Sequence, residues 1–199
     1  MLDYALLYSL ARKYNCKRYL EIGTYIGTSI NILTDLCDEL HSLTFEPSQS
    51  VGTINRLKKF NIPYYGDRLA YSPKIVHHYG DSKVFDFNSI PQNIDLYFID
   101  GDHSFNGVYC DTINVFKHRK PDSIVVWHDF KSDRHEVAWA VKTVLSPEDW
   151  KNVFCFDMNI CGIYLPPELQ SDFTFRKLQY TEEPQELWCY DVTLIPTKR

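Results

Sequence analysis

The stretch IDLYFIDGDHSF, residues 94–105, joins an apolar run to a cluster of groups that can hold or move a proton. Asp100, Asp102 and His103 close the apolar run or follow it directly. An imidazole titrates near neutral pH and can accept a proton from an alcohol, which makes His103 a candidate general base. The alternative is that these residues cap the next helix and face water.

A further carboxylate, Asp129, ends the apolar run SIVVWHD (123–129). Two carboxylates about 4 Å apart repel each other by on the order of 4 kcal/mol at an effective dielectric constant near 20. If Asp100 and Asp129 meet at neighbouring strand ends, a cation must therefore stabilise them. That cation is either a metal ion or a positively charged part of a ligand.

The stretch LEIGTYIGTS (20–29) has the pattern of a strand that turns into a helix. Gly23 allows a tight turn and lets a ligand approach the backbone closely, and the start of a helix favours negative charge. Glu46 ends the next strand and can accept both hydroxyls of a ribose beside that turn. Taken singly, these features also fit an ordinary strand-to-helix turn and a surface glutamate.

The spacing of the glycines helps to distinguish a dinucleotide from other adenosine-containing cofactors. Dinucleotide sites usually show G-x-G-x-x-G, whereas this chain has G-x-x-x-G with the bulky Tyr25 at the second glycine position. Glu21 lies just before the turn, where it would repel a pyrophosphate. S-Adenosyl-L-methionine carries a sulfonium and an ammonium but no phosphate, so these residues favour it as the cofactor.

Strand-like and helix-like segments alternate along the chain, which predicts a mostly parallel sheet with helices on both faces. Seven strands are expected at residues 17–23, 41–47, 74–79, 94–100, 123–129, 150–156 and 161–166. Helices are expected at 2–14, 28–40, 48–60, 104–118 and around 137–145. Residues 61–73 show no clear period, and 186–195 could add an edge strand. Ligands of such sheets bind at the carboxyl ends of the strands, and several candidate residues fall there: Gly23, Glu46, Asp81, Asp100 and Asp129.

Composition narrows the classes of function. The net charge of −5, from 21 basic and 26 acidic residues, argues against broad nucleic-acid binding. The six cysteines form no C-x-x-C pair, which favours free thiols in a reducing cytoplasm. The sequence has no run of about 18 apolar residues and no export signal, so we expect no membrane partner and a cytoplasmic location. We expect one domain over residues 1–199, with a core at about 17–165 and a C-terminal extension at 166–199.

Several motifs in a fixed order resemble class I S-adenosylmethionine-dependent methyltransferases. They are LEIGTYIGTS, TFEPS, GDS (80–82), YFIDGDHSFNGVYCD (97–111) and IVVWHDF (124–130), and together they cover roughly residues 17–165. In detail the chain is similar to the small O-methyltransferases of the catechol and caffeoyl-CoA type and to sugar-modifying relatives. The resemblance implies a Rossmann-like methyltransferase sandwich and O-methylation of a small hydroxylated acceptor, namely a sugar, a glycan or a secondary metabolite.

The resemblance also implies roles for individual residues. Those around the methionine part of the cofactor would be Glu21, Gly23, Thr24, Tyr25, Gly27 and Ser29. Glu46 would bind the ribose, and Asp81 and Ser82 would lie beside the adenine. Asp100 and Asp129 match positions that hold a divalent cation such as magnesium in metal-dependent members. Asp100 would also contact the cofactor. His103 matches the general base of some sugar-modifying relatives.

One position departs from the pattern, because Phe130 stands where catechol-type enzymes commonly have an asparagine ligand. A bound metal is therefore an open alternative, with His128, Asp102 or waters as candidates to complete its ligands. Two other functions also stay open at this point: an NAD(P)-dependent Rossmann oxidoreductase and a non-catalytic cofactor-binding scaffold. A homo-oligomer is a further alternative.

Overall fold

The computed structural model of the protein describes residues 2–25, 27–45, 72–132, 136–156, 159–178 and 189–194. Among these residues, none of the helices has the length and apolar character that a membrane crossing requires. Five of the described cysteines are free thiols: Cys16, Cys37, Cys110, Cys155 and Cys161.

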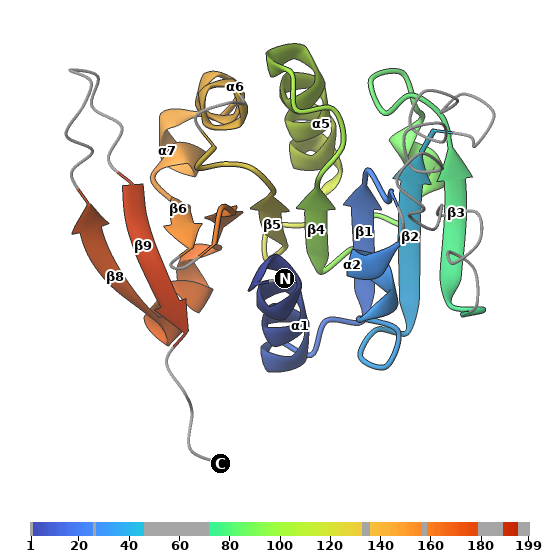
Figure 1. The fold of residues 1–199 in the computed structure, drawn as a ribbon, viewed down its shortest axis with the longest axis horizontal. Helices are drawn as coiled ribbons and strands as arrows, with labels where there is room; N and C mark the ends of the chain where they lie inside the picture. Colours follow the sequence, from blue (N-terminus) through green and yellow to red (C-terminus); the bar gives the residue numbers. More distant parts are fainter. Residues whose placement is uncertain are drawn as a thin grey trace, which may run out of the picture.

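A single sheet organises the described chain, with its strands in the order β3-β2-β1-β4-β5-β7-β6-β9-β8. Figure 1 shows this row from β3 at one edge to β8 at the other. The strands are β1 (Arg18–Ile22), β2 (Glu39–Thr44), β3 (Ile75–Tyr79), β4 (Leu96–Ile99), β5 (Ile124–Trp127), β6 (Val153–Phe156), β7 (Gly162–Tyr164), β8 (Phe173–Leu178) and β9 (Cys189–Leu194). Strands β1 to β5 pair in parallel, and β7 is antiparallel to both β5 and β6. The seven predicted strands and their mostly parallel pairing are confirmed.

The prediction for the C-terminal extension needs a correction. The segment at 186–195 does add a strand, but β9 pairs with β6 on one side and with β8 on the other. The edge of the sheet is therefore β8, whose strand was not predicted. Its sequence FTFRKL alternates apolar and polar residues over only its first four positions, which is a weak signal by itself.

Helices cover both faces of the sheet, as predicted. They are α1 (Leu2–Lys13), α2 (Thr28–Asn31), α5 (Phe105–His118), α6 (Val137–Val144) and α7 (Pro147–Trp150), with short 3-10 turns η2 (Phe87–Ser89) and η3 (Pro167–Asp172). Successive strand residues point to opposite faces. Phe98 and Val126 therefore pack with α1 and α2, whereas Tyr97 and Val125 pack with α5 and α6.

The helix predicted at 28–40 is wrong in length. It ends at Asn31, turns follow, and β2 begins at Glu39. The apolar residues of this stretch still reach the core, because Leu33 and Cys37 are fully buried in the turns. The helix predicted at 48–60 and most of the segment at 61–73 lie outside the described residues.

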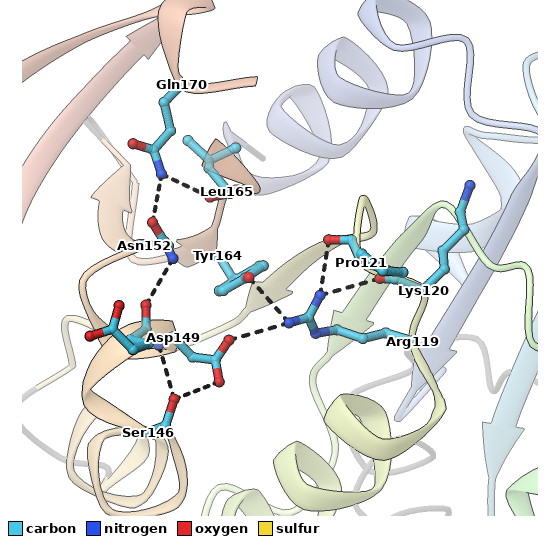
Figure 2. Close-up of polar contacts among 10 residues, drawn as sticks. Arg119, Lys120, Pro121, Ser146, Asp149, Asn152, Tyr164, Leu165 and Gln170 are labelled. Atoms are coloured by element: carbon cyan, nitrogen blue, oxygen red, sulfur yellow. Dashed lines mark hydrogen bonds and ion pairs between the residues drawn. The ribbon is translucent and has the colours of Figure 1, made fainter. Parts of the chain in front are cut away.

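A polar network ties the last turn of α5 to α7 and β7 (Figure 2). The Arg119 guanidinium donates to the hydroxyl of Tyr164 (3.1 Å) and to Asp149 (3.4 Å), and it stacks on the ring of Phe116. Gln170 of η3 joins the same region through the side chain of Asn152. Because α5 runs back from the end of β4 to the start of β5, this network lies at the amino-terminal edge of the sheet. The network therefore stabilises the packing of helices and strands at the edge of the sheet opposite the candidate site.

Candidate active site

The candidate residues gather at the carboxyl ends of β1, β3, β4 and β5, as the parallel topology requires. A cavity of about 250 Å³ opens there, and its lining includes five predicted residues: Gly23, Tyr25, Asp81, Ser82 and Asp100. Phe45 also lines this cavity. The predicted ribose ligand Glu46 follows Phe45 in the sequence but lies outside the described residues.

The turn after β1 depends on glycine. Gly23 has a φ of +90°, and a Cβ at this position would overlap the carbonyl group of Asp100. Gly27 also has a positive φ, and its N–H donates to the carbonyl of Thr24 (2.8 Å). Tyr25 adopts a left-handed conformation as well (φ 48°), which costs a bulky residue about 1–3 kcal/mol. The turn therefore stores strain at the cavity wall.

Glu21 is the most deeply buried charged residue of this region, with 0% of its surface exposed. Its Oε2 accepts hydrogen bonds from Ser29 (2.7 Å) and from the hydroxyl of Tyr19 (3.0 Å). Its Oε1 has no hydrogen-bond partner among the described residues. Burial raises the pKa of Glu21 to about 7, and the surrounding hydroxyls offset only part of that effect. A buried acid with one vacant acceptor suits a cationic ligand, and the residues present therefore fit the ammonium of S-adenosyl-L-methionine.

Two other predicted residues, Thr24 and Gly27, do not line the cavity. Thr24 is buried, and its hydroxyl is 2.5 Å from that of Ser42 on β2. Gly27 starts α2, which has four residues, so the favourable effect of a helix start on negative charge is weaker than the sequence suggested.

The loop after β3 brings Asp81 and Ser82 to the opposite wall of the cavity. Asp81 accepts from the backbone N–H of Lys83 (3.0 Å). The Lys83 ammonium lies 3.4 Å from Asp102 and 3.9 Å from Asp81, so it bridges the loops after β3 and β4. Asn114 of α5 donates to the carbonyl of Ser82 (3.0 Å).

Asp100 and Asp129 meet as predicted, and two histidines lie between them. Asp100 Oδ1 is 3.1 Å from His103 Nε2 and 3.1 Å from His128 Nδ1. Asp129 Oδ2 is 3.5 Å from His103 Nε2, and Asp129 Oδ1 is 3.5 Å from His128 Nδ1. The carboxylates of this His-Asp cluster, Asp100, His103, His128 and Asp129, are therefore stabilised by imidazoles of the chain itself.

Charge interactions within the cluster shift several pKa values. The hydrogen bond to Asp100 raises the pKa of His103, against the effect of burial. Burial lowers the pKa of His128, but Asp100, Asp3 and Asp129 together outweigh it and raise the value to about 10. Burial likewise acts to raise the pKa of Asp100, while the two histidines lower it overall. At neutral pH, His128 is accordingly an imidazolium between carboxylates.

The donor set does not fit magnesium, which prefers oxygen ligands in octahedral geometry. Ligand atoms of Asp100, His103 and His128 lie within 4.8 Å of one another, a spacing that could hold a metal ion, but two of these three donors are imidazoles. Phe130 supplies no ligand, because its side chain has no donor atom; its ring is buried at 4% exposure and packs against Trp127. This donor set therefore gives a magnesium ion no catalytic role at the cluster.

Sequence reasoning missed three polar residues of this region. Asp3 of α1 lies 3.7 Å from His128, and Asp111 of α5 lies buried behind the loop after β3. Lys83 lines the cavity. Asp3 has no signal in the sequence, since an acidic residue in the first turn of a helix is common for reasons of charge alone. Asp111 could have been suspected, because it interrupts the apolar face of the predicted helix at 104–118.

Fold and site together define a Rossmann-like α/β protein, whose ligands bind at the carboxyl ends of the parallel strands. A family model described as a methyltransferase domain matches residues 20–130, more than half of the 199 residues. The chain belongs to this methyltransferase family. The motifs predicted S-adenosyl-L-methionine as the cofactor, and membership of this methyltransferase family agrees with that prediction.

Individual relatives are distant. Protein R132 of Acanthamoeba polyphaga mimivirus, described as uncharacterised, is 25% identical over 119 residues, which are 58% of this chain and 52% of the viral protein. The chain thus spans about half the length of that relative.

Solved structures share the fold at low identity. The apo structure of CalS11, a TDP-rhamnose 3'-O-methyltransferase of calicheamicin biosynthesis, aligns with a TM-score of 0.58 and 12% identity over 82% of this chain and 77% of that chain. The N-methyltransferase NodS from Bradyrhizobium japonicum WM9 aligns with a TM-score of 0.50 and 13% identity over 81% and 91%. The predicted Rossmann-like methyltransferase fold is confirmed.

Proposed function

We propose that the protein transfers a methyl group from S-adenosyl-L-methionine to a hydroxyl of a small acceptor, namely a sugar, a glycan or a secondary metabolite. One observation carries the proposal. Asp100 lines the cavity and also accepts a hydrogen bond from His103, so a proton-accepting group adjoins the cofactor cavity. An oxygen acceptor needs such a group, because its proton must leave as the methyl group arrives.

When bound, the cofactor supplies a methyl group on a positively charged sulfur. Glu21 would hold the ammonium with its free oxygen, and Gly23 would let the backbone approach the ligand. Asp81 and Ser82 lie on the opposite wall, where Asp81 would accept from the exocyclic amine of adenine. Holding two reactants in line in a dry site can supply most of the acceleration of such a transfer.

His103 would take the proton of the acceptor hydroxyl at Nδ1, because its Nε2 already carries the hydrogen that it donates to Asp100. Asp100 and Asp129 lie 3.1 and 3.5 Å from Nε2 and stabilise the imidazolium that forms. His128 carries a positive charge of its own and keeps the two carboxylates together. In this arrangement Asp100 and Asp129 assist catalysis by orienting and stabilising His103.

Two structural neighbours are in keeping with an oxygen acceptor. CalS11 is a TDP-rhamnose 3'-O-methyltransferase, and a putative O-methyltransferase from Klebsiella pneumoniae aligns with a TM-score of 0.50, at 15% identity over 96% of this chain and 76% of that chain. The family assignment and the G-x-x-x-G turn argue against an NAD(P)-dependent oxidoreductase. A scaffold without catalysis would have no use for the His-Asp cluster beside its cavity.

The test begins with binding. Calorimetry should show S-adenosylhomocysteine binding and no binding of NAD; the reverse pattern would reject a methyltransferase. Isotope-labelled S-adenosyl-L-methionine is then incubated with panels of sugar nucleotides, free glycans and phenols, and mass spectrometry identifies labelled products. Label on an amine in place of a hydroxyl would overturn the proposed O-methylation.

The role of His103 is tested by replacement. His103→Ala should reduce kcat by about a hundredfold or more and leave the affinity for S-adenosylhomocysteine nearly unchanged. Asn106→Ala is the matched control, because Asn106 is an exposed residue in the first turn of α5, which begins just after His103. An unchanged kcat in His103→Ala would remove the proposed base.

A further inference from the structure

The donor atoms of the His-Asp cluster, which do not suit magnesium, suit a transition-metal ion. Imidazole is a good ligand of zinc, copper and nickel, whereas carboxylates and waters are the ligands of magnesium. Asp100, His103 and His128 each offer one ligand atom, and these three atoms lie within 4.8 Å of one another. Two imidazoles and one carboxylate also make up the ligand set of several catalytic zinc sites, which keep a fourth position open.

The distances within the cluster match the size of a tetrahedral zinc site. Zinc lies about 2.0–2.2 Å from its nitrogen and oxygen ligands, so two ligands of one ion are about 3.4 Å apart. Asp100 Oδ1 is 3.1 Å from both His103 Nε2 and His128 Nδ1. Asp129 Oδ2 and Oδ1 lie 3.5 Å from His103 Nε2 and His128 Nδ1, respectively. Small side-chain movements therefore suffice for one ion to replace the hydrogen bonds among these groups.

Asp3 of α1 gives His128 the environment of a metal ligand. Its Oδ2 lies 3.7 Å from Nε2, the second ring nitrogen of His128. Metal-binding histidines commonly donate their other ring N–H to a carboxylate, which orients the ring and makes it a stronger ligand. The side chains of His103, Asp100 and His128 are 28%, 26% and 23% exposed, so the cluster is open to an ion from solvent.

We propose that Asp100, His103 and His128 form a binding site for Zn²⁺ or a similar transition-metal ion, and that the bound ion inhibits methyl transfer. This site differs from the magnesium site that the resemblance implies, because imidazoles supply two of its ligands and because its ion opposes catalysis. Binding depends on these side chains alone. The inhibition rests on the proposed function, in which His103 is the base.

The inhibition follows from the ring nitrogens that the ion occupies. Coordination at His128 Nδ1 displaces the proton there to solvent and leaves the proton at Nε2, beside Asp3. Coordination at His103 Nε2 displaces a proton as well, and the neutral ring then carries its hydrogen at Nδ1. A second proton reaches solvent where His103 was an imidazolium before the ion bound. With Nε2 on the ion and a hydrogen on Nδ1, His103 has no lone pair left for the proton of an acceptor hydroxyl.

Binding is measured first, on the protein without cofactor. Calorimetry should show one Zn²⁺ per chain, and Co²⁺ should give the intense visible absorption of a four-coordinate ion, which Mg²⁺ at the same concentration should not displace. His128→Gln should weaken zinc binding by more than about a hundredfold and abolish the cobalt absorption, and Asp3→Ala should weaken zinc binding by about tenfold. If His128→Gln does not fold, His103→Gln removes another ligand and decides.

His78→Gln is the matched control. His41 Nδ1 and His78 Nε2 lie 3.0 Å apart on β2 and β3, so this histidine pair is the competing place for an ion. The control should leave the Kd for zinc within twofold of the wild-type value. A loss of affinity in His78→Gln equal to that in His128→Gln overturns the inference, and so does wild-type affinity in both His128→Gln and His103→Gln.

Turnover is measured afterwards. Zinc at a concentration that saturates the site should reduce methyl transfer at least tenfold, and EDTA should restore it. Full turnover with the site saturated overturns the proposed inhibition. A metal-free protein that transfers no methyl group contradicts the proposed function instead, and the zinc and cobalt titrations still decide whether the site exists.

Discussion

Replacement of Glu21 by glutamine should stabilise the free protein and weaken cofactor binding at the same time. Glu21 is fully buried, accepts hydrogen bonds only on Oε2 among the described residues, and has its pKa raised to about 7 by burial. Glutamine keeps an acceptor for Ser29 and Tyr19 but cannot ionise. It therefore removes the cost of burying a charge and also the charge that would hold the ammonium.

The size of the effect follows from the shift in pKa. Each pKa unit corresponds to about 1.4 kcal/mol, so a rise from the ordinary 4.5 to about 7 corresponds to about 3 kcal/mol. The folded state binds the proton more tightly than the unfolded state, so the wild type loses this stability as the pH rises from 4.5 through 7. The free energy of unfolding of Glu21→Gln, measured relative to that of wild type, should therefore rise by about 3 kcal/mol between pH 4 and pH 8.

Urea unfolding at several pH values from 4 to 8 measures this difference, and other titrating groups cancel because both proteins share them. Ser29→Ala serves as a comparison, because it removes a donor to Oε2 and should steepen the loss of stability with pH. A free-energy difference between Glu21→Gln and wild type that stays constant across this range would refute the reasoning.

Ligand binding provides a second measurement on the same residue. Near pH 6.5 the Glu21 carboxyl of the free protein carries a proton, which it must release when an ammonium binds. Calorimetry of S-adenosylhomocysteine in two buffers with different ionisation enthalpies should show release of up to about one proton for wild type. Glu21→Gln should bind at least tenfold more weakly and lack this release, since one charged contact contributes about 1.5–3 kcal/mol.

Three further predictions concern the turn, the frame and the metal. Gly23→Ala should lower the free energy of unfolding by at least about 2 kcal/mol, because its Cβ meets the backbone at Asp100; an unchanged urea midpoint would contradict the turn geometry. Arg119→Met should lower the free energy of unfolding by about 2–4 kcal/mol, because it breaks the hydrogen bonds to Asp149 and Tyr164. It should leave the Kd for S-adenosylhomocysteine within twofold, since these bonds lie at the edge of the sheet opposite the candidate site. EDTA should leave turnover within about twofold, and restoration of lost turnover by magnesium would show that the donor set was misjudged.

Sequence patterns predicted the features that depend on the spacing of apolar residues within one segment or on the position of a glycine. Strand β4 and helix α5 were placed to within two residues, because their apolar patterns are continuous and Ser104 marks the start of the helix. The turn at Gly23 was found from its residue types. Parallel topology then placed Asp81, Asp100 and Asp129 at one edge of the sheet without any knowledge of contacts.

What escaped prediction depends on contacts between distant segments. The stretch at 28–40 has helical spacing, yet Leu33 and Cys37 reach the core from turns, since burial alone does not fix the backbone conformation. Asp3 is 125 positions from His128, and no local pattern relates them. Strand β8 depends on pairing with β9 more than on its own sequence.

The His-Asp cluster gives a physical answer to the repulsion of Asp100 and Asp129. Two carboxylates about 4 Å apart repel each other by on the order of 4 kcal/mol. A protonated imidazole at 3.1–3.5 Å from both Asp100 and Asp129 offsets such repulsion without an external ion. The pKa of about 10 for His128 is the other side of the same interaction, because the carboxylates that need a cation also hold its proton. His103 shares these carboxylates, and the hydrogen bond to Asp100 raises its pKa while burial opposes that effect. In the proposed mechanism the two histidines therefore have different tasks: His128 supplies a fixed charge, and His103 acts as the base.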